Sequence, residues 1–190
     1  MGCVAVKVII SSCPRSGTKY TAKVLQRVGL RVGHERIKRD GVVSWYSTIL
    51  PPFDSTAERW HQIREPLATI GSLLTITDAS YRVLRHVIDF EDAPTKTAKC
   101  CAVYLGLHAA GCKAAKAFRI EDADKVFPQI FKSMKVEPSN NEWRGIEKTV
   151  NTRRHARMTW QRIRDEAPHW HDRVKQFARE WEYVTEWTSN

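Results

Sequence analysis

The 190-residue sequence has no apolar run that approaches the roughly 18 residues needed for a transmembrane helix. Its N-terminal residues do not show the basic segment, apolar stretch and cleavage site of a secretory signal peptide. Internal repeats, low-complexity segments and linkers rich in Gly, Ser or Pro are also missing. These absences predict a single soluble domain over residues 1–190, cytoplasmic and without a membrane partner.

Cysteine and histidine do not form the patterns of a disulfide framework or a metal site. The cysteines make an odd set without Cys-x2-Cys spacing, which favours reduced thiols in a cytoplasm. They are Cys3, Cys13, Cys100, Cys101 and Cys112. The histidines offer only His169-x-His171, close to the end of the chain, so we expect no metal ion.

The charge of the chain is strongly basic and unevenly distributed. The formal net charge is +10; residues 1–40 hold nine Lys/Arg and two Asp/Glu, whereas residues 41–140 hold twelve and eleven. Basic proteins attract polyanions, nucleic acid included. No RNP motif, zinc-finger spacing or basic tail supports a nucleic-acid partner. We expect the basic surplus to surround a site for a small polyanionic ligand.

The most informative segment is residues 6–21, VKVIISSCPRSGTKYT. A β-branched apolar run ends abruptly in small and turn-forming residues, and a helical pattern begins directly after them. This order predicts a buried strand, a tight loop and a helix N-terminus. Backbone N–H groups and the helix dipole favour an anion there, usually phosphate, and Arg15 and Lys19 add positive charge.

The rest of the chain continues in a βαβ order. We expect a helix over residues 18–29, a strand over 30–33 that leads into His34-Glu35, and a strand over 59–63 that ends at Arg64. Residues 42–50 are compatible with helix or strand. The carboxyl ends of such strands form the ligand-binding edge of a sheet.

Helical patterns dominate the second half of the chain. One helix is expected after Pro66, a second over residues 79–89, and a third from residue 95 to a predicted end at Gly111. A strand over 114–120 precedes a helix, and Pro128 is expected either to interrupt this helix or to begin the next turn. Pro168 divides the last helical residues. The predicted fold class is therefore α/β, a three-layer domain with a mostly parallel four- to five-stranded sheet.

Two known phosphate-binding loops fit residues 12–19 incompletely. A Walker A loop requires Gly-x4-Gly-Lys-Ser/Thr, but residue 12 is serine and Thr18 follows Gly17. A phosphatase loop of the Cys-x5-Arg type could begin at Cys13, but its last position is Lys19, which lacks the two-pronged contact of arginine. Both alternatives are weakened without being excluded.

Residues 14–20, Pro-Arg-Ser-Gly-Thr-Lys-Tyr, resemble the 5′-phosphosulfate loop of PAPS-dependent sulfotransferases, written Pro-Lys/Arg-Ser-Gly-Thr-x-aromatic. The second motif of that family is Arg-x-Pro on the third strand, with a serine eight residues after the arginine. Arg64-Glu65-Pro66 and Ser72 match its sequence and spacing. The chain thus looks like a small member of the family, of bacterial or phage type, and the resemblance implies a P-loop-like fold.

The resemblance also implies how the donor, PAPS, is bound. Ser16, Gly17, Thr18 and Lys19 would hold the 5′-phosphosulfate, largely through backbone N–H groups. Tyr20 would stack on the adenine.

Three further cationic positions would serve the leaving nucleotide, adenosine 3′,5′-bisphosphate (PAP). Arg15 would contact the oxygen that bridges phosphate and sulfate and neutralise the charge that develops there. The fork of Arg64 and the hydroxyl of Ser72 would converge on the 3′-phosphate. Arg153 or Arg154, assigned by position and charge only, would reach the same phosphate.

The general base is expected after the second strand. Glu35 matches a glutamate of the carbohydrate-acting members of the family, so it is the first choice, and His34 is the second. A glutamate whose pKa is raised by burial can act as a base near neutral pH. Alternatively, Glu35 forms a structural ion pair with Arg15, Lys19 or Arg36.

These expectations define a sulfotransferase that moves a sulfuryl group from PAPS to a hydroxyl or amine of a small-molecule or carbohydrate acceptor. In-line transfer of this kind needs no metal ion. Two alternatives stay open: a nucleotide-dependent phosphotransferase, and a non-catalytic protein that binds PAP or another nucleotide. The sequence does not identify the acceptor or the oligomeric state.

Overall fold

The computed structural model describes residues 6–48, 56–86, 88–90, 92–138, 141–147 and 157–184. The chain forms two compact units, each made of two segments. Unit 1 comprises Met1–Arg64 and His108–Thr152, and unit 2 comprises Glu65–Leu107 and Arg153–Asn190. The single domain expected over residues 1–190 stays a prediction.

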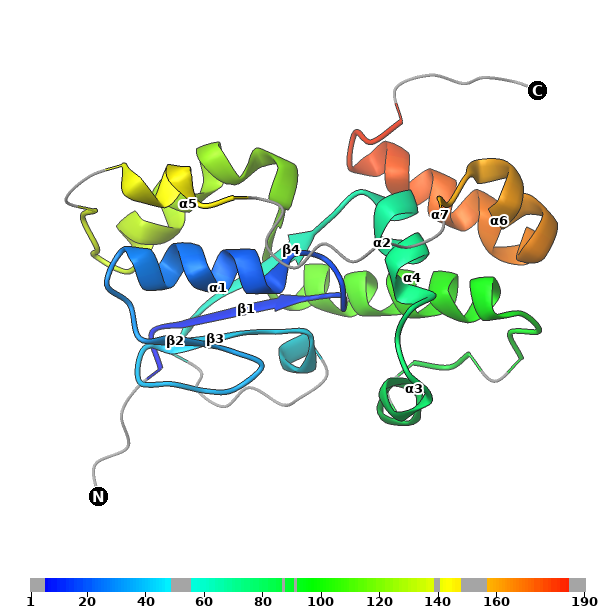
Figure 1. Cartoon of the computed structure of the whole chain (residues 1–190), viewed down its shortest axis with the longest axis horizontal. Coiled ribbons are helices and arrows are strands. Elements are labelled where there is room, and N and C mark those ends of the chain that lie inside the picture. The colour runs from blue at the N-terminus through cyan, green and yellow to red at the C-terminus, as the bar shows by residue number, and fades with distance from the viewer. Residues whose placement is uncertain are drawn as a thin grey trace. The chain divides into compact units, whose positions relative to one another are not determined.

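Unit 1 contains a five-stranded parallel sheet (Figure 1). Its strands are β1 (Val8–Ser12), β2 (Val32–His34), β3 (Gly41–Ser44), β4 (Glu58–Ile63) and β5 (Lys116–Arg119), in the order β2-β3-β1-β4-β5. The predicted α/β class and parallel sheet are confirmed. The ambiguous residues 42–50 begin as strand β3, and a 3₁₀ turn over Trp45–Thr48 follows.

One face of the sheet is covered by α1 (Thr18–Arg27) and α5 (Ala123–Ser133), which lie on the same side of the strands (Figure 1). Side chains from both helices and from alternate strand positions, such as Val8 and Ile10, form the main core. Pro128 does not interrupt α5, contrary to expectation. Phe127 and Phe131 pack in the core on both sides of it, so burial of this face maintains the helix.

The opposite face is covered by the end of α4 (Lys96–Ala114), so unit 1 has the three layers that were expected. Gly111 was predicted to end this helix, but it lies inside it. A Cβ at Gly111 would lie 2.0 Å from His61 Nδ1 on β4. The glycine therefore allows the helix to approach the strand closely, which is a packing function and not a capping one.

Unit 2 contains α2 (Pro66–Leu73), α3 (Asp78–Leu84), the first part of α4, α6 (Trp160–Glu166) and α7 (Pro168–Glu180). Proline begins α2 and α7, a position at which its missing N–H costs nothing. The Glu65 carboxylate accepts hydrogen bonds from the N–H groups of Leu67 and Ala68 at 2.9 and 2.6 Å. This side chain closes the N-terminus of α2.

The strand order distributes the basic residues of the N-terminal part between the two edges of the sheet. Lys7, Arg31 and residues 38–39 precede β1, β2 and β3, so they lie at the amino edge. Arg15 and Lys19 follow β1 and lie at the carboxyl edge. The expectation that the basic surplus surrounds the anion loop is therefore wrong for these four amino-edge residues.

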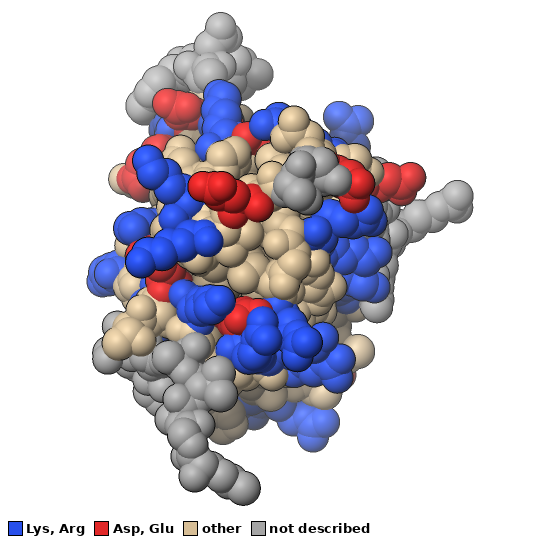
Figure 2. Space-filling model, turned by 90° about the vertical axis from the view of Figure 1, so that its left-hand side faces the viewer, with Lys and Arg blue, Asp and Glu red and all other residues tan. Residues whose placement is uncertain are grey.

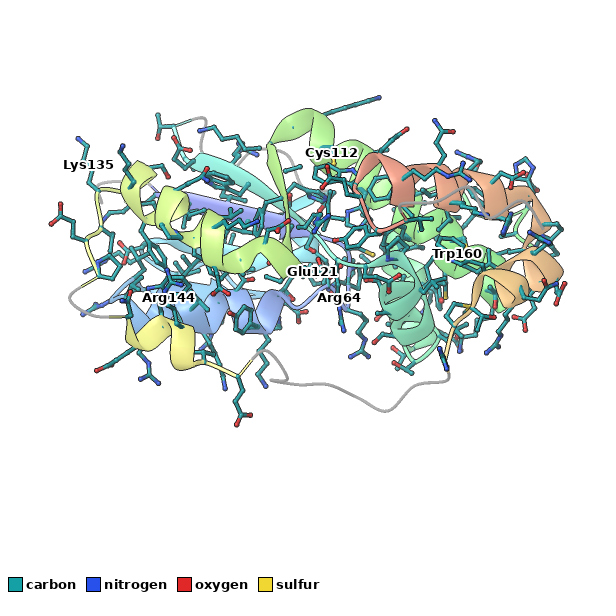
Figure 3. All side chains as sticks on the ribbon, turned by 90° about the horizontal axis from the view of Figure 1, so that it is seen from above. Arg64, Cys112, Glu121, Lys135, Arg144 and Trp160 are labelled. Carbon is teal, nitrogen blue, oxygen red and sulfur yellow. The ribbon has the colours of Figure 1, made fainter. Side chains whose placement is uncertain are left out.

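Basic side chains are also visible away from the loop in two other views of the molecule. Figure 2 faces the amino edge, where basic side chains cover more of the surface than acidic ones. In Figure 3, Lys135 and Arg144 lie toward one end of unit 1, whereas Arg64 lies toward the other. A general positive field thus extends well beyond the anion loop and would attract anions from a distance.

Candidate active site

The loop between β1 and α1 presents a helix N-terminus at the carboxyl edge of the sheet. Arg15 and Gly17 have left-handed backbone conformations, with φ of 70° and 86°. Gly17 is the residue before the helix, no described side chain caps it, and the first turn of α1 carries no acidic residue. The first-turn N–H groups of α1 and its dipole therefore favour an anion.

Ser16 supplies a second indication of an anion. Its side chain is fully buried, and its hydroxyl has no hydrogen-bond partner among the described residues. A buried polar group without a partner is costly and uncommon. An oxyanion bound at the loop would satisfy it, so the residues present fit a phosphate or sulfate group.

Gln62 of β4, which the sequence analysis did not single out, holds the loop through hydrogen bonds of its side chain. Its Nε2 donates to the carbonyl oxygen of Ser16, and its Oε1 accepts from the Thr21 hydroxyl of α1. The Gln62 side chain is fully buried. One signal was present in the sequence: adjacent His61 and Gln62 in a short strand place polar groups on both faces of a buried sheet.

The second motif meets the loop inside unit 1. β1 and β4 are neighbouring parallel strands, so their carboxyl ends bring Arg64 beside the loop. Arg64 Nη1 donates to the carbonyl oxygen of Arg15 at 2.9 Å. Two segments 49 residues apart thus form one cationic edge.

His34 lies at the same edge and contacts the loop. Its Nε2 is 3.0 Å from the Thr18 hydroxyl, and 3.9 Å from Glu35 Oε1. Burial lowers the pKa of His34, and Lys19 acts in the same direction, against the opposing charge of Glu35. The imidazole is therefore neutral at neutral pH and able to accept a proton.

Glu35 differs from the expectation that burial would adapt it as a base. Its side chain is 45% exposed, and its Oε1 lies 3.9 Å from Nε2 of the neutral His34 ring. Its backbone is left-handed, with φ of 57°, and its N–H donates to Val43 at 3.1 Å. The structure therefore offers no burial by which Glu35 would become a stronger base.

Lys19 and Tyr20 were also expected to contact the donor. Lys19 is exposed at the start of α1. Tyr20 is only 3% exposed and packs against Phe127 with ring centroids 6.1 Å apart, and burial, with a smaller effect of Asp124, raises its pKa. Adenine stacking by Tyr20 stays a prediction, and it is disfavoured because the buried ring leaves little surface for a ligand.

Three residues were expected to bind the 3′-phosphate together with Arg64, and none of them is described in unit 1. Ser72 is buried in α2 of unit 2, so its convergence with Arg64 stays a prediction. Arg153 and Arg154 lie outside the described residues.

Several other site types find no support. Cys13 is fully buried, which does not suit the nucleophile of a phosphatase loop. Among the described residues, no group of three or more His, Cys, Asp or Glu is placed to hold a metal ion. Within the same residues, no helix has both the length and the apolar character to cross a bilayer.

Comparisons with known proteins gave a distant structural likeness. No protein-family model matches the chain, and no curated protein sequence matches it. Among solved structures, it is similar to mouse sulfotransferase SULT7A1 complexed with PAP, with a TM-score of 0.43 and 13% sequence identity. That likeness covers 85% of this chain and 66% of the mouse chain, so this chain spans less than two thirds of that neighbour's length.

Proposed function

We propose that the chain is a PAPS-dependent sulfotransferase that acts on a hydroxyl or amine of a small-molecule or carbohydrate acceptor. The observation that carries the proposal is the hydrogen bond of 2.9 Å from Arg64 to the Arg15 carbonyl. This bond joins the loop motif at residues 14–20 to the Arg-x-Pro motif at Arg64. From the sequence, the two motifs are associated only through the resemblance to the family. An anion-binding loop occurs in many proteins, but this loop has a second arginine beside it for a second phosphate.

The loop residues would bind the 5′ end of the donor. The first-turn N–H groups of α1 and the buried Ser16 hydroxyl would bind an oxyanion, and the Lys19 ammonium would add charge. Arg15 would stabilise negative charge on the leaving oxygen. PAPS, when bound, supplies the sulfuryl group and leaves as PAP.

Arg64 would select the donor from other adenine nucleotides. Its guanidinium is a planar group with several N–H donors, and one of these donors is bonded to the Arg15 carbonyl beside the loop. A bidentate contact of arginine with a phosphate is strong and directional. Together with Ser72 and with Arg153 or Arg154, this residue would distinguish a 3′-phosphate from a 3′-hydroxyl.

His34 replaces Glu35 as the first choice of general base. It is neutral because burial lowers its pKa, and it lies within hydrogen-bonding distance of Thr18 in the donor loop. Glu35, exposed beside it, would orient the ring or stabilise the imidazolium that forms. Since the His34 pKa is below 6.5, activity should decline only at more acidic pH.

Calorimetric titration with PAP and ADP tests the donor. We expect PAP to bind about tenfold or more tightly than ADP, because a phosphate bound by an arginine contributes at least about 1.4 kcal/mol. Arg64→Ala should remove most of that preference, whereas Arg85→Ala, an exposed arginine of unit 2, should leave it unchanged. Equal affinities in the wild type, or a preference for ADP, would favour a phosphotransferase.

Sulfur-labelled PAPS and a panel of alcohols, sugars and amines test the reaction. His34→Asn should keep PAP affinity and lose about 100-fold or more in turnover, whereas Glu35→Gln should lose less. The opposite ranking would return the base to Glu35. Tight PAP binding without turnover on any acceptor would support the non-catalytic alternative.

A further inference from the structure

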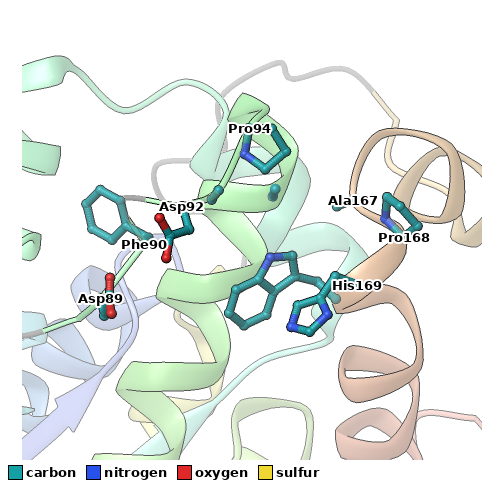
Figure 4. A pocket seen from close by; sticks show the side chains of 10 residues that line it. Asp89, Phe90, Asp92, Pro94, Ala167, Pro168 and His169 are labelled. Carbon is teal, nitrogen blue, oxygen red and sulfur yellow. The ribbon is translucent and has the colours of Figure 1, made fainter.

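Unit 2 contains a hollow of about 300 Å³, and none of the residues that line it belongs to the loop of unit 1. One wall is formed by residues 89–90 and 92–94 and the other by residues 167–170, and Ala98 of α4 also lines the hollow. Figure 4 shows Asp89, Phe90 and Asp92 on one side and Ala167, Pro168 and His169 on the other. The volume is at the lower limit of small-molecule sites.

Small side chains create this hollow. Ala93, Ala98 and Ala167 line it and are 5% exposed or less, so these short side chains leave space between the two described walls. Phe90 and the half-buried Trp170 supply aromatic surface beside them. An apolar hollow with aromatic walls and few polar groups has the composition of a binding site for an organic ligand.

The charges around the hollow favour a cation. Asp89 and Asp92 are both exposed and lie on the same wall. Among the described residues, Asp92 forms no ion pair or side-chain hydrogen bond. A pair of carboxylates is notable in a chain with a net charge of +10.

The two helix ends at the hollow do not provide an alternative anion site. Thr95 Oγ1 accepts a hydrogen bond from the Ala98 N–H at 3.0 Å and so caps the start of α4. Helix α7 begins at Pro168, which has no N–H to donate. Neither end therefore resembles the uncapped N-terminus of α1.

The charge beside Trp170 indicates where the cationic group and the apolar body of a ligand would lie. The Arg173 guanidinium is 4.6 Å from the Trp170 ring and already contributes a positive charge there. The His169 ring packs on the same indole with centroids 5.5 Å apart. The cationic group would thus lie near Asp89 and Asp92, and an apolar body would lie against Phe90 and Trp170.

We propose that this hollow, the Asp89–Trp170 pocket, binds a small organic ammonium compound that carries an apolar or aromatic body. The proposal is independent of the proposed sulfotransferase function, because all the lining residues belong to unit 2 and none is a residue of the donor loop. The ammonium group binds the carboxylates, and burial of the body against the alanine and aromatic surface supplies the apolar contribution.

The test uses the full chain and a pair of probes that differ in charge, 2-phenylethylammonium and 2-phenylethanol. Binding is followed by NMR through the indole N–H of Trp170, assigned with Trp170→Phe. We expect the amine to bind at least about fivefold more tightly than the alcohol, and the difference to shrink at high salt. Equal binding of the two probes, or no binding of the amine at 10 mM scale concentrations, overturns the proposal.

Substitutions locate the site. Asp92→Asn should weaken amine binding about threefold to fivefold, and the double substitution with Asp89→Asn about tenfold, without affecting the alcohol. Asp165→Asn, an exposed acid of α6 in the same unit, is the matched control and should have no effect. If the double variant binds the amine as the wild type does, the carboxylates are not the recognition groups. Circular dichroism checks that each variant is folded.

Discussion

We predict that the stability of unit 1 falls steeply between pH 6.5 and pH 4 because of two buried histidines. His61 Nδ1 lies 2.8 Å from Ser11 Oγ, and His61 Nε2 lies 2.8 Å from His108 Nδ1. Both rings are fully buried, and burial lowers the pKa of His61 from 6.5 to about 4 and that of His108 well below its usual value. The unfolded chain therefore binds these protons at a higher pH than the folded chain does.

The magnitude follows from the difference between the two values. A change from 6.5 to about 4 for His61 corresponds to about 3 kcal/mol of unfolding free energy. This stability is complete above pH 6.5 and is lost progressively as the pH decreases toward 4. His108 acts in the same direction, and half-buried His34 adds a smaller contribution of the same sign.

Urea unfolding at a series of pH values, followed by tryptophan fluorescence, measures this loss. A His61→Gln and His108→Gln double variant should have a flatter pH profile, whereas His86→Gln, at an exposed position, should keep the wild-type profile. NMR titration of the wild type gives an independent measurement that does not depend on folding of the variant. Ring signals of His61 that titrate near pH 6.5 in the folded protein, or constant stability down to pH 5, would refute the reasoning.

Three further substitutions have defined outcomes. Gly111→Ala should lower the unfolding free energy by about 1–3 kcal/mol, because its Cβ would collide with a buried imidazole, whereas Gly145→Ala, with no atom within 4 Å of the added carbon, should be nearly neutral; chemical denaturation compares them. Gln62→Glu should weaken PAP binding about tenfold in calorimetry, since a carboxylate cannot donate to the loop carbonyl; unchanged affinity would mean that the loop holds its shape without this bond. Glu65→Ala should cost about 1 kcal/mol in urea unfolding through loss of the α2 cap, a result that an unaltered midpoint would contradict.

Much of the fold was predictable because its signals are local. The apolar run before Cys13 and the turn residues after it define β1 and the start of α1, and Pro66 and Pro168 mark helix starts. The errors came from tertiary contacts. Gly111 has the sequence context of a helix end, but its missing Cβ accommodates a ring that is 50 residues away in the chain. Pro128 has the context of a break, but the core holds its helix together.

The candidate site shows the same division. The anion loop and Arg64 were identified from motif spacing, and the structure brings them together. Gln62 was missed because its function depends on two partners in other elements, which no local pattern reports. Glu35 was preferred to His34 by analogy, and both stay predictions; the burial of His34, on which our proposal rests, depends on the fold and has no local signal.

The attachment of the loop through Gln62 has a kinetic consequence. One side chain joins β4, the loop and the first turns of α1, so these segments have already lost their conformational freedom before any anion arrives. Association should then require little rearrangement and be limited mainly by diffusion in the positive field of the protein. Affinity at such a preorganised site would be adjusted chiefly through the lifetime of the complex.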